Sequence, residues 1–284
     1  MRQITISCLA AVMMLFLSAC GFIKTVHDQS STPPYEPETL HIQFVSAEED
    51  GEQVNAFADL LAKELGIPVE LKLTSDYEKA GKDIRSKKSD LVMMQPADYV
   101  EANQSREAIV LLQPQLSTGD PKEKVTSVKG RILFDKTSGF TSLKDLAGKT
   151  IAVQEGKAVV QLGDLAKAGI DVQKDLTFVY VTSDTEGIEA VKKRKADALI
   201  TLETTSAKGL RQLETENRIP NDAIAVRPDM TDEWQESIRQ TFLSLDESKE
   251  GRQLILTLFG HVGYVPAEES DFDIIRQSQE LVER

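Results

Sequence analysis

Polar side chains follow two predicted strands of this chain at the point where each strand ends. Segment 40–45 alternates between apolar and polar residues, which predicts a β-strand, and Ser46 follows it directly. Segment 90–94 is short and apolar, which predicts a buried strand, and Gln95 comes next. Open α/β sheets bind ligands beyond the carboxyl ends of their strands. Ser46 and Gln95 are therefore candidate ligand-binding residues, with a hydroxyl and an amide that could hydrogen-bond a small polar solute.

The first twenty residues have the order of a secretory signal. Arg2 supplies a positive charge, residues 6–17 are mostly apolar, and two small residues precede Cys20. The apolar run is shorter than the roughly 20 residues that a membrane-spanning helix needs. Residues 17–20 (LSAC) resemble the bacterial lipobox, whose cysteine is lipidated and becomes the first residue of the mature chain. We therefore expect a signal peptide over 1–19 and lipid on Cys20, with an ordinary signal peptide as the alternative.

The remaining composition argues against several classes of function. The net charge is −13, whereas a nucleic-acid surface needs clustered basic residues. Without Cys8 and Cys20 the folded part has no cysteine for a disulfide or a metal. His27, His41 and His261 lack metal-ligand spacing, and the sequence has neither a glycine-rich phosphate loop nor a Gly-x-Ser-x-Gly motif. We expect no metal, no cofactor and no enzymatic activity.

Strand-like and helix-like segments alternate beyond a proline-containing stretch at 20–39, which is interpreted as a mobile tether. Strands are predicted at 40–45, 69–73, 90–94, 131–134, 150–153, 176–181, 197–201 and 223–226. Helices are predicted at 53–65, 76–87, 142–146, 159–168, 185–194, 204–216, 234–245, 251–258 and 271–284. This order, which restarts midway, predicts an α/β protein of two lobes, each a mixed, mostly parallel sheet flanked by helices. A cleft between lobes is a usual place for a small ligand.

Five phrases of the sequence resemble those of phosphonate-type periplasmic-binding proteins. They are residues 75–77 (SDY), 89–92 (SDLV), 141–150 (TSLKDLAGKT), 219–227 (IPNDAIAVR), and 263–267 (GYVPA) followed by 271–276 (DFDIIR). The resemblance implies the type II periplasmic-binding-protein fold, with residues 40–128 and 223–284 in lobe 1 and 129–222 in lobe 2. It further implies a membrane-anchored, extracytoplasmic and monomeric solute-binding protein of an ABC importer, which closes around its solute and docks on a membrane permease.

The resemblance also implies further site residues. Tyr77 is placed where the family has a ligand-facing aromatic residue, and Glu203 where the family has an acidic contact to the amine of an aminophosphonate. The family's hydroxyl-rich loop is replaced here by Gln-Glu-Gly-Lys, in which Gly156 is a candidate contact and Lys157 is interpreted as a solvated charge. Asp184 stands where many members have histidine, and it also suits a helix cap.

These departures change the expected solute. Carboxylates at Asp184 and Glu203, without the hydroxyl-rich loop, favour a zwitterionic, cationic or neutral polar solute over free phosphate. A phosphonate-like solute is still compatible with the family resemblance. The alternative is a lipoprotein that uses the same fold for sensing or partner binding, with a degenerate pocket. The segments near 127–131 and 220–225 are expected to act as the hinge.

Overall fold

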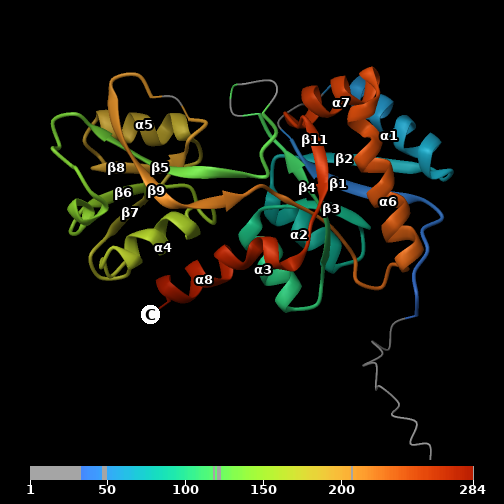
Figure 1. The fold of residues 1–284 in the computed structure, drawn as a ribbon, viewed down its shortest axis with the longest axis horizontal. Helices are drawn as coiled ribbons and strands as arrows, with labels where there is room; N and C mark the ends of the chain where they lie inside the picture. Colours follow the sequence, from blue (N-terminus) through green and yellow to red (C-terminus); the bar gives the residue numbers. More distant parts are fainter. Residues whose placement is uncertain (1–32, 47–49, 118, 120–122, 206, 284) are drawn as a thin grey trace, which may run out of the picture. The chain divides into compact units, whose positions relative to one another are not determined.

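Two β-sheets organise the chain (Figure 1). The computed structural model describes residues 33–46, 50–117, 119, 123–205 and 207–283. The first sheet has the order β11-β4-β10-β3-β1-β2, and the second has the order β7-β6-β8-β5-β9. The first contains β1 (Leu40–Val45), β2 (Val69–Thr74), β3 (Leu91–Met94), β4 (Ile109–Gln115), β10 (Ala223–Val226) and β11 (Gly263–Pro266). The second contains β5 (Ser127–Asp135), β6 (Thr150–Val153), β7 (Thr177–Tyr180), β8 (Ala198–Leu202) and β9 (Leu210–Pro220).

Both sheets mix parallel and antiparallel neighbours. In the first sheet β1 runs parallel to β2 and β3, whereas β10 runs antiparallel to β3 and β4. In the second sheet β6 runs parallel to β7 and β8, whereas β5 runs antiparallel to β8 and β9. Parallel neighbours need a crossover, usually a helix, and such helices cover the faces of a sheet. The predicted class, two α/β lobes with mixed sheets flanked by helices, is confirmed. The sheets are not mostly parallel, because two of the five pairings in the first sheet and two of the four in the second are parallel.

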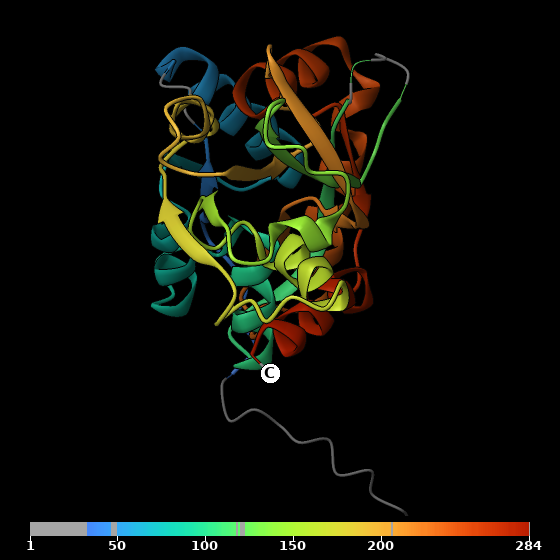
Figure 2. The ribbon, with the colours of Figure 1, turned by 90° about the vertical axis from the view of Figure 1, so that its left-hand side faces the viewer.

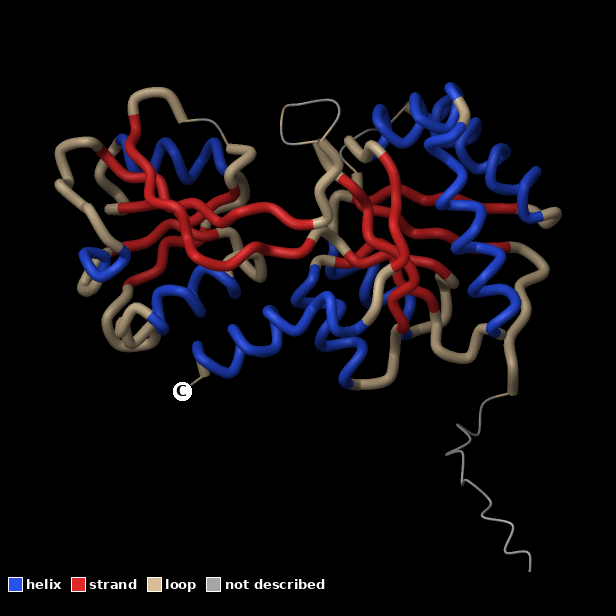
Figure 3. The backbone as a smooth tube through the Cα atoms, in the orientation of Figure 1, coloured by secondary structure: helices blue, strands red, loops and turns tan. Residues whose placement is uncertain are grey.

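Helices flank the two sheets in the arrangement that Figure 3 shows. The helices are α1 (Gly51–Leu65), α2 (Tyr77–Arg85), α3 (Pro96–Gln104), α4 (Val159–Lys167), α5 (Asp184–Lys192), α6 (Asp232–Ser244), α7 (Lys249–Phe259) and α8 (Asp273–Val282). Side chains of α1, α6 and α7 share one core cluster with the first sheet, and those of α2 and α3 share another. The second sheet likewise packs one cluster with α4 and another with α5.

Strand β3 shows why its sequence is apolar without interruption. Leu91 and Met93 belong to the core cluster on one face of the sheet, and Val92 and Met94 belong to the cluster on the other. Successive side chains of a strand point to opposite faces, so a strand buried on both faces needs an apolar residue at every position. All four residues are buried, as the short apolar segment predicted.

The chain crosses between the sheets twice, from β4 to β5 and back from β9 to β10. Asn221 joins the two crossings, because its amide nitrogen donates 2.8 Å hydrogen bonds to the carbonyl oxygens of Pro114 and Val125. Its backbone amide also donates to the carbonyl of Thr126 at 2.8 Å. The two crossings are thus held side by side, at the positions where a hinge was expected.

One predicted element is wrong and three elements were missed. Residues 204–216 were expected to form a helix, but Leu210–Pro220 is strand β9. The leucines at 210 and 213 have a spacing that also suits a helix, yet β9 forms a long antiparallel ladder with β5. Pairing with a distant strand therefore overrides the local pattern. Strands β4 and β11 and helix α3 were not predicted, and α3 begins at Pro96, a favourable first helical position.

The two ends of the described chain are packed against its body. Tyr35, within the predicted tether, stacks on Arg227 with the guanidinium carbon 3.7 Å from the ring centroid, and its amide donates to the carbonyl of Asp229. At the other end, α8 lies beside α4 of the second sheet, as the red and yellow-green helices of Figure 2 show. Ile275 of α8 packs in a core of the first sheet, and Val282 packs in a core of the second. Helix α8 therefore bridges the two lobes.

Within the described ranges, no helix combines the length and the apolar character needed to cross a lipid bilayer. The predicted signal peptide and the predicted lipidation site, Cys20, lie outside the described residues.

Candidate functional site

A cavity of about 370 Å³ lies where the two sheets meet the crossing segments. Val45 and Met93 line it from the first sheet, and Ile200 and Thr201 line it from the second. Pro220, at the end of β9, contributes to the wall between them. Its volume is within the range of small-molecule sites. No cluster of residues that could hold a metal ion occurs in the part of the chain that the structure describes.

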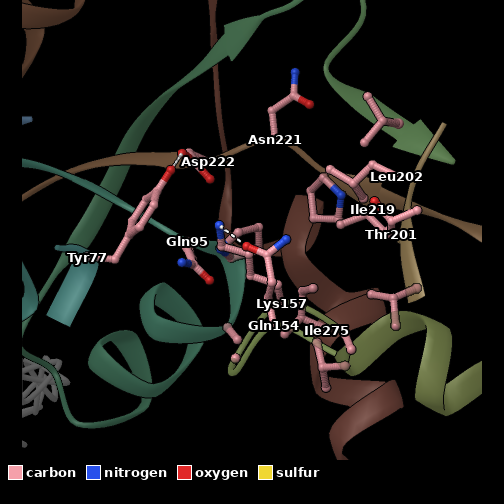
Figure 4. A pocket seen from close by; sticks show the side chains of 18 of the residues that line it. Tyr77, Gln95, Gln154, Lys157, Thr201, Leu202, Ile219, Asn221, Asp222 and Ile275 are labelled. Carbon is pink, nitrogen blue, oxygen red and sulfur yellow. Dashed lines mark hydrogen bonds between the residues drawn. The ribbon is translucent and has the colours of Figure 1, made fainter. Parts of the chain in front are cut away.

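One side of the cavity is polar (Figure 4). The hydroxyl of Tyr77, the first residue of α2, donates a 2.7 Å hydrogen bond to the carboxylate of Asp222. Lys157 Nζ lies 5.8 Å from the centroid of the Tyr77 ring and 3.3 Å from Gln154 Oε1. Gln95 lies near these side chains in the close view. Polar groups from both sheets therefore converge on one region.

Burial and neighbouring charges set the proton affinity of the Tyr77–Asp222 pair. Burial raises the pKa of Asp222 to about 6, while the hydrogen bond from Tyr77 and the charge of Lys157 lower it and the charge of Asp98 raises it. Burial and the carboxylate of Asp222 also raise the pKa of Tyr77. At pH 7 the phenol is therefore neutral, and the carboxylate is mostly ionised.

The first turn of α4 faces the same region. Residues 156–160 all line the cavity, and no side chain caps the helix at Ala158. The first backbone N–H groups of a helix have no partner within the helix, and with the helix dipole they favour an anion. Lys157 adds a positive charge directly before this turn. The arrangement of α4 and Lys157 can therefore hold an anionic group.

The opposite side of the cavity is apolar. Leu202 and Ile219 lie together in Figure 4, away from the Tyr77–Asp222 pair, and Ile275 lies below them. They come from β8, β9 and α8, and Val128 of β5 also lines the cavity. Apolar walls exclude water and so strengthen electrostatic interactions inside the site. The cavity can therefore bind a solute with a polar end and an apolar part.

Four of the six residues predicted from the sequence to bind ligand line this cavity. They are Tyr77, Gln95, Gly156 and Asp184. Gly156 and Gln95 belong to different lobes, and a Cβ atom on Gly156 would lie 3.7 Å from Gln95 Oε1, so the lobes approach each other here. Asp184 accepts a 2.7 Å hydrogen bond from Gln154 and another from Thr205. Its carboxylate therefore orients neighbouring side chains of its own lobe.

Ser46 and Glu203 do not belong to the cavity lining. Ser46 Oγ donates a 2.5 Å hydrogen bond to the carbonyl oxygen of Leu258. The carboxylate of Glu203 accepts a 2.7 Å hydrogen bond from the amide of Lys129 and lies 3.6 Å from the guanidinium of Arg218. Both side chains thus have protein partners beside the cavity.

Several lining residues were missed as ligand contacts in the sequence. Asp222 and Asn221 follow Pro220 in a segment that was expected only to cross between lobes, and Gln161 reads as an ordinary helix residue. Lys157 is exposed, as expected of a solvated charge, yet it also lines the cavity. Asn221 and Asp222, the two polar residues after Pro220, are the one local feature of the sequence that suggests a ligand contact here. The sequence cannot show which way their side chains point.

Comparisons with known proteins concern the family and the fold of this chain. Residues 42–272 match the family model described as ABC transporter, phosphonate, periplasmic substrate-binding protein. A solved structure of a Xanthomonas citri protein bound to ATP is similar, with 16% identity, a TM-score of 0.71, and coverage of 87% of this chain and 98% of that one.

Two phosphonate-related structures are also similar. PhnD1 from Prochlorococcus marinus in complex with methylphosphonate has 18% identity and a TM-score of 0.66, with coverage of 87% of this chain and 99% of that one. A binding protein component of an ABC phosphonate transporter from Pseudomonas aeruginosa has 16% identity and a TM-score of 0.65, with coverage of 89% and 87% respectively. At these identities the likeness concerns the fold, which is the type II periplasmic-binding-protein fold expected from the sequence.

Proposed function

The chain belongs to the phosphonate-binding family of periplasmic ABC-transporter substrate-binding proteins, and we propose that it captures a small organic solute with an anionic group. The role of this family is to bind a solute and present it to an importer, rather than to catalyse a reaction. The proposed solute is phosphonate-like or zwitterionic and occupies the cavity between the lobes. Its anionic group lies at the first turn of α4.

The observation that carries this proposal is the position of Lys157 at the uncapped start of α4. Its ammonium group faces the ring of Tyr77 across the cavity. This ammonium group and the first backbone N–H groups of α4 therefore lie on the side of the cavity opposite Tyr77. This chain lacks a hydroxyl-rich loop after β6, and Lys157 with the helix amides supplies donors in its place. Glu155 is exposed and is not among the lining residues, so it does not oppose an anion inside the cavity.

Release and capture of the solute would need the lobes to separate. Two pairs face each other across the cavity from different lobes, namely Lys157 with Tyr77 and Gly156 with Gln95. We infer that opening about the crossings joined by Asn221 separates both pairs and exposes the cavity. Hinge motions of this kind require large backbone changes at only a few residues.

We further propose that lipid on Cys20 holds the protein at the outer face of the cell membrane. The family places the folded part outside the cytoplasm, next to a membrane permease. A single acyl chain gives only weak and reversible membrane binding, whereas two or more give stable anchoring. Mass spectrometry of the membrane fraction, compared between the wild type and Cys20→Ser, tests this. An unmodified cysteine, or an unchanged membrane fraction in the variant, would refute the anchor.

The solute itself is tested by calorimetric titration of the purified protein. The probes are inorganic phosphate, methylphosphonate, 2-aminoethylphosphonate, taurine and β-alanine. We expect at least one organic anion to bind, and a hundredfold excess over its Kd to raise the free energy of unfolding by about 2.7 kcal/mol. Lys157→Met should weaken this binding by about tenfold or more, because a charge-assisted contact is lost.

Lys167→Met is the matched control, because this exposed lysine lies at the opposite end of α4 from Lys157 and outside the cavity lining. Its affinity for the solute should equal that of the wild type. If no probe binds the wild-type protein, the transport proposal loses its support and the alternative, a sensing or partner-binding lipoprotein, is favoured. If Lys157→Met binds as the wild type does, the anionic group lies elsewhere.

A further inference from the structure

A chain of side-chain hydrogen bonds in the second lobe ends at the ammonium group of Lys157. Lys157 Nζ lies 3.3 Å from Gln154 Oε1 (Figure 4), and Gln154 Nε2 donates a 2.7 Å hydrogen bond to the carboxylate of Asp184. The second carboxylate oxygen of Asp184 accepts from the hydroxyl of Thr205. This hydroxyl lies 2.8 Å from that of Thr201 in β8. Side chains from β8, α5 and the loop after β6 are thus linked to a lysine of the cavity lining.

The chemistry of these groups fixes the direction of each bond. A carboxylate only accepts and an ammonium group only donates, so the amide nitrogen of Gln154 faces Asp184 and its oxygen faces Lys157. Thr205 has one hydroxyl hydrogen, which it donates to Asp184, so Thr201 donates to Thr205. A Gln154 amide turned the other way would place its N–H groups against Lys157 and its oxygen against the carboxylate. Asp184 therefore sets which end of Gln154 meets the lysine.

The turn between β6 and α4 returns Lys157 to Gln154. The backbone amide of Lys157 donates to the carbonyl of Gln154 at 3.2 Å, and Gly156 between them has a φ of 74°. Glycine adopts this left-handed conformation without a steric penalty. The turn therefore places the backbone of Lys157, while the side-chain oxygen of Gln154 holds the ammonium group at the end of an exposed side chain.

Asp184 has two opposite effects on an anion in the cavity. Its negative charge repels the anion. However, both of its oxygens accept hydrogen bonds from side chains of its own lobe, and Ser183 rather than Asp184 caps α5. Lys157 has a flexible four-carbon stem, and ordering such a side chain on binding weakens affinity unless the side chain is held beforehand. The hydrogen-bond chain supplies this order before the solute arrives.

We propose that Asp184 is a positioning residue, which acts through Gln154 to hold the ammonium group of Lys157 where the anionic group of the solute binds. Asp184 does not itself contact the solute, and an acidic residue of the lining thus supports the binding of an anion. This inference rests on the proposed function for what Lys157 binds. The positioning of Lys157 is present without a solute and is tested separately.

Two variants of Asp184 separate its hydrogen bond from its charge. Asp184→Ala removes both acceptor oxygens, so calorimetry should show about threefold to tenfold weaker binding of an anion, although a repelling charge is lost. Asp184→Asn removes the same charge and keeps an oxygen that can accept from Gln154, so it should restore the lost affinity. The probe is whichever of methylphosphonate, 2-aminoethylphosphonate and taurine binds the wild type most tightly. Glu155→Gln is the control, because this exposed carboxylate of the same turn lies outside the cavity lining, and it should not weaken binding.

A double-mutant cycle shows whether the effect passes through Lys157. In a Lys157→Met background the change Asp184→Ala should no longer weaken binding, because the group that it positions is absent. A general disturbance of the lobe would weaken binding in both backgrounds. Gln154→Met removes the middle of the chain and should act as Asp184→Ala does, which keeps the test valid if Asp184→Ala does not fold in a thermal melt.

A measurement without solute tests the positioning directly. Carbon NMR relaxation of the ε-methylene group of Lys157 reports how freely the end of this side chain moves. We expect greater motion in Asp184→Ala and in Gln154→Met than in the wild type, and wild-type motion in Asp184→Asn. Lys167, at the far end of α4, is the internal control and should be unaffected in all variants.

The possible results separate this inference from the proposed function. If folded Asp184→Ala binds the anion as tightly as the wild type or more tightly, the positioning role is refuted while the anion-binding function stands. Equal weakening with and without Lys157 also refutes it. If no probe binds the wild type, the proposed function fails, and the relaxation data decide alone. Equal motion of Lys157 in the wild type and Asp184→Ala would then overturn the positioning.

Discussion

The hydroxyl of Tyr77 donates a 2.7 Å hydrogen bond to the carboxylate of Asp222, which lies 145 residues later in the chain. Tyr77 begins α2 beside the first sheet, and Asp222 lies in the segment by which the chain returns from the second sheet. This segment joins the lobes and also lines the cavity, so the bond connects the segment of the expected hinge to the cavity wall.

Removal of the Tyr77 hydroxyl should raise the pKa of Asp222. The hydrogen bond favours the ionised carboxylate and lowers its pKa, so Tyr77→Phe should move it above its value of about 6. An NMR titration of the Asp222 carboxyl carbon measures this shift directly. Tyr180→Phe, at an exposed tyrosine, should leave the pKa of Asp222 unchanged. An unchanged or lower pKa in Tyr77→Phe would show that the hydrogen bond does not stabilise the ionised form.

Asp222 should make the protein less stable as the pH rises from about 4 to about 6. Its pKa in the folded state is about 6, compared with 3.8 for an ordinary aspartate, so the folded state binds the proton more tightly. The stability that this proton contributes is present below pH 3.8 and is lost as the pH rises through 6. Burial lowers the pKa of His261 to about 3. His261 acts in the opposite direction, because the stability that its neutral form contributes to the protein is lost as the pH falls below 6.5.

The variant Asp222→Asn isolates this effect. The free energy of unfolding of the variant minus that of the wild type should increase by up to about 3 kcal/mol between pH 4 and pH 6 and then level off. Urea unfolding at several pH values measures the difference, and His261 cancels because both proteins contain it. A difference that is constant with pH would show that Asp222 has an ordinary pKa in the folded protein.

Arg227 should be essential for the stability of the first lobe. Its guanidinium lies 3.3 Å from the carboxylate of Asp90 and 2.6 Å from that of Asp229, and it stacks on Tyr35. Arg227→Met leaves the carboxylate of Asp90, which is 2% exposed, without this cation. We expect a loss of about 3 to 5 kcal/mol in the free energy of unfolding, measured in urea. Arg239→Met, which breaks a pair with Glu236 within an exposed helix face, should cost far less.

The packing of α8 on α4 depends on a glycine. A Cβ atom on Gly163 would lie 2.7 Å from Ser278 Cβ and 3.0 Å from its Cα, which is too close for any ordinary contact. Gly163→Ala should therefore push α8 away and destabilise the protein by about 1 to 3 kcal/mol in a thermal melt. Gly51→Ala is the control, since a Cβ there has no heavy atom within 4 Å.

A second substitution tests whether this contact is the cause. Ser278→Gly removes the side chain that the new methyl group meets, so the double variant should recover part of the stability lost in Gly163→Ala. Additive losses in the double variant would place the damage elsewhere. Because Ile275 of α8 also lines the cavity, the single variant should weaken solute binding too.

The sequence by itself determined the elements whose apolar residues form a clear local pattern. Strands at 150–153 and 223–226 match β6 and β10 residue for residue, because apolar runs buried on both faces leave a local signature. The rule that ligands bind beyond the carboxyl ends of strands selected Gln95, which lines the cavity, and Ser46, which does not, whereas Gly156 was expected from the family resemblance. The edge strand β9 gave no such signature, because it is half exposed and is fixed by pairing with β5.

Only the tertiary structure decided which polar groups share the cavity. The crossing from β9 to β10 places Asp222 against Tyr77 and Asn221 in the cavity wall, and α4 places Gln161 there. The carboxylate of Glu203 instead accepts a hydrogen bond from the amide of Lys129. Hydrogen bonds between residues far apart in the chain depend on how the lobes meet. Local periodicity records which face of an element is buried, and it contains no information about the partner that the face will meet.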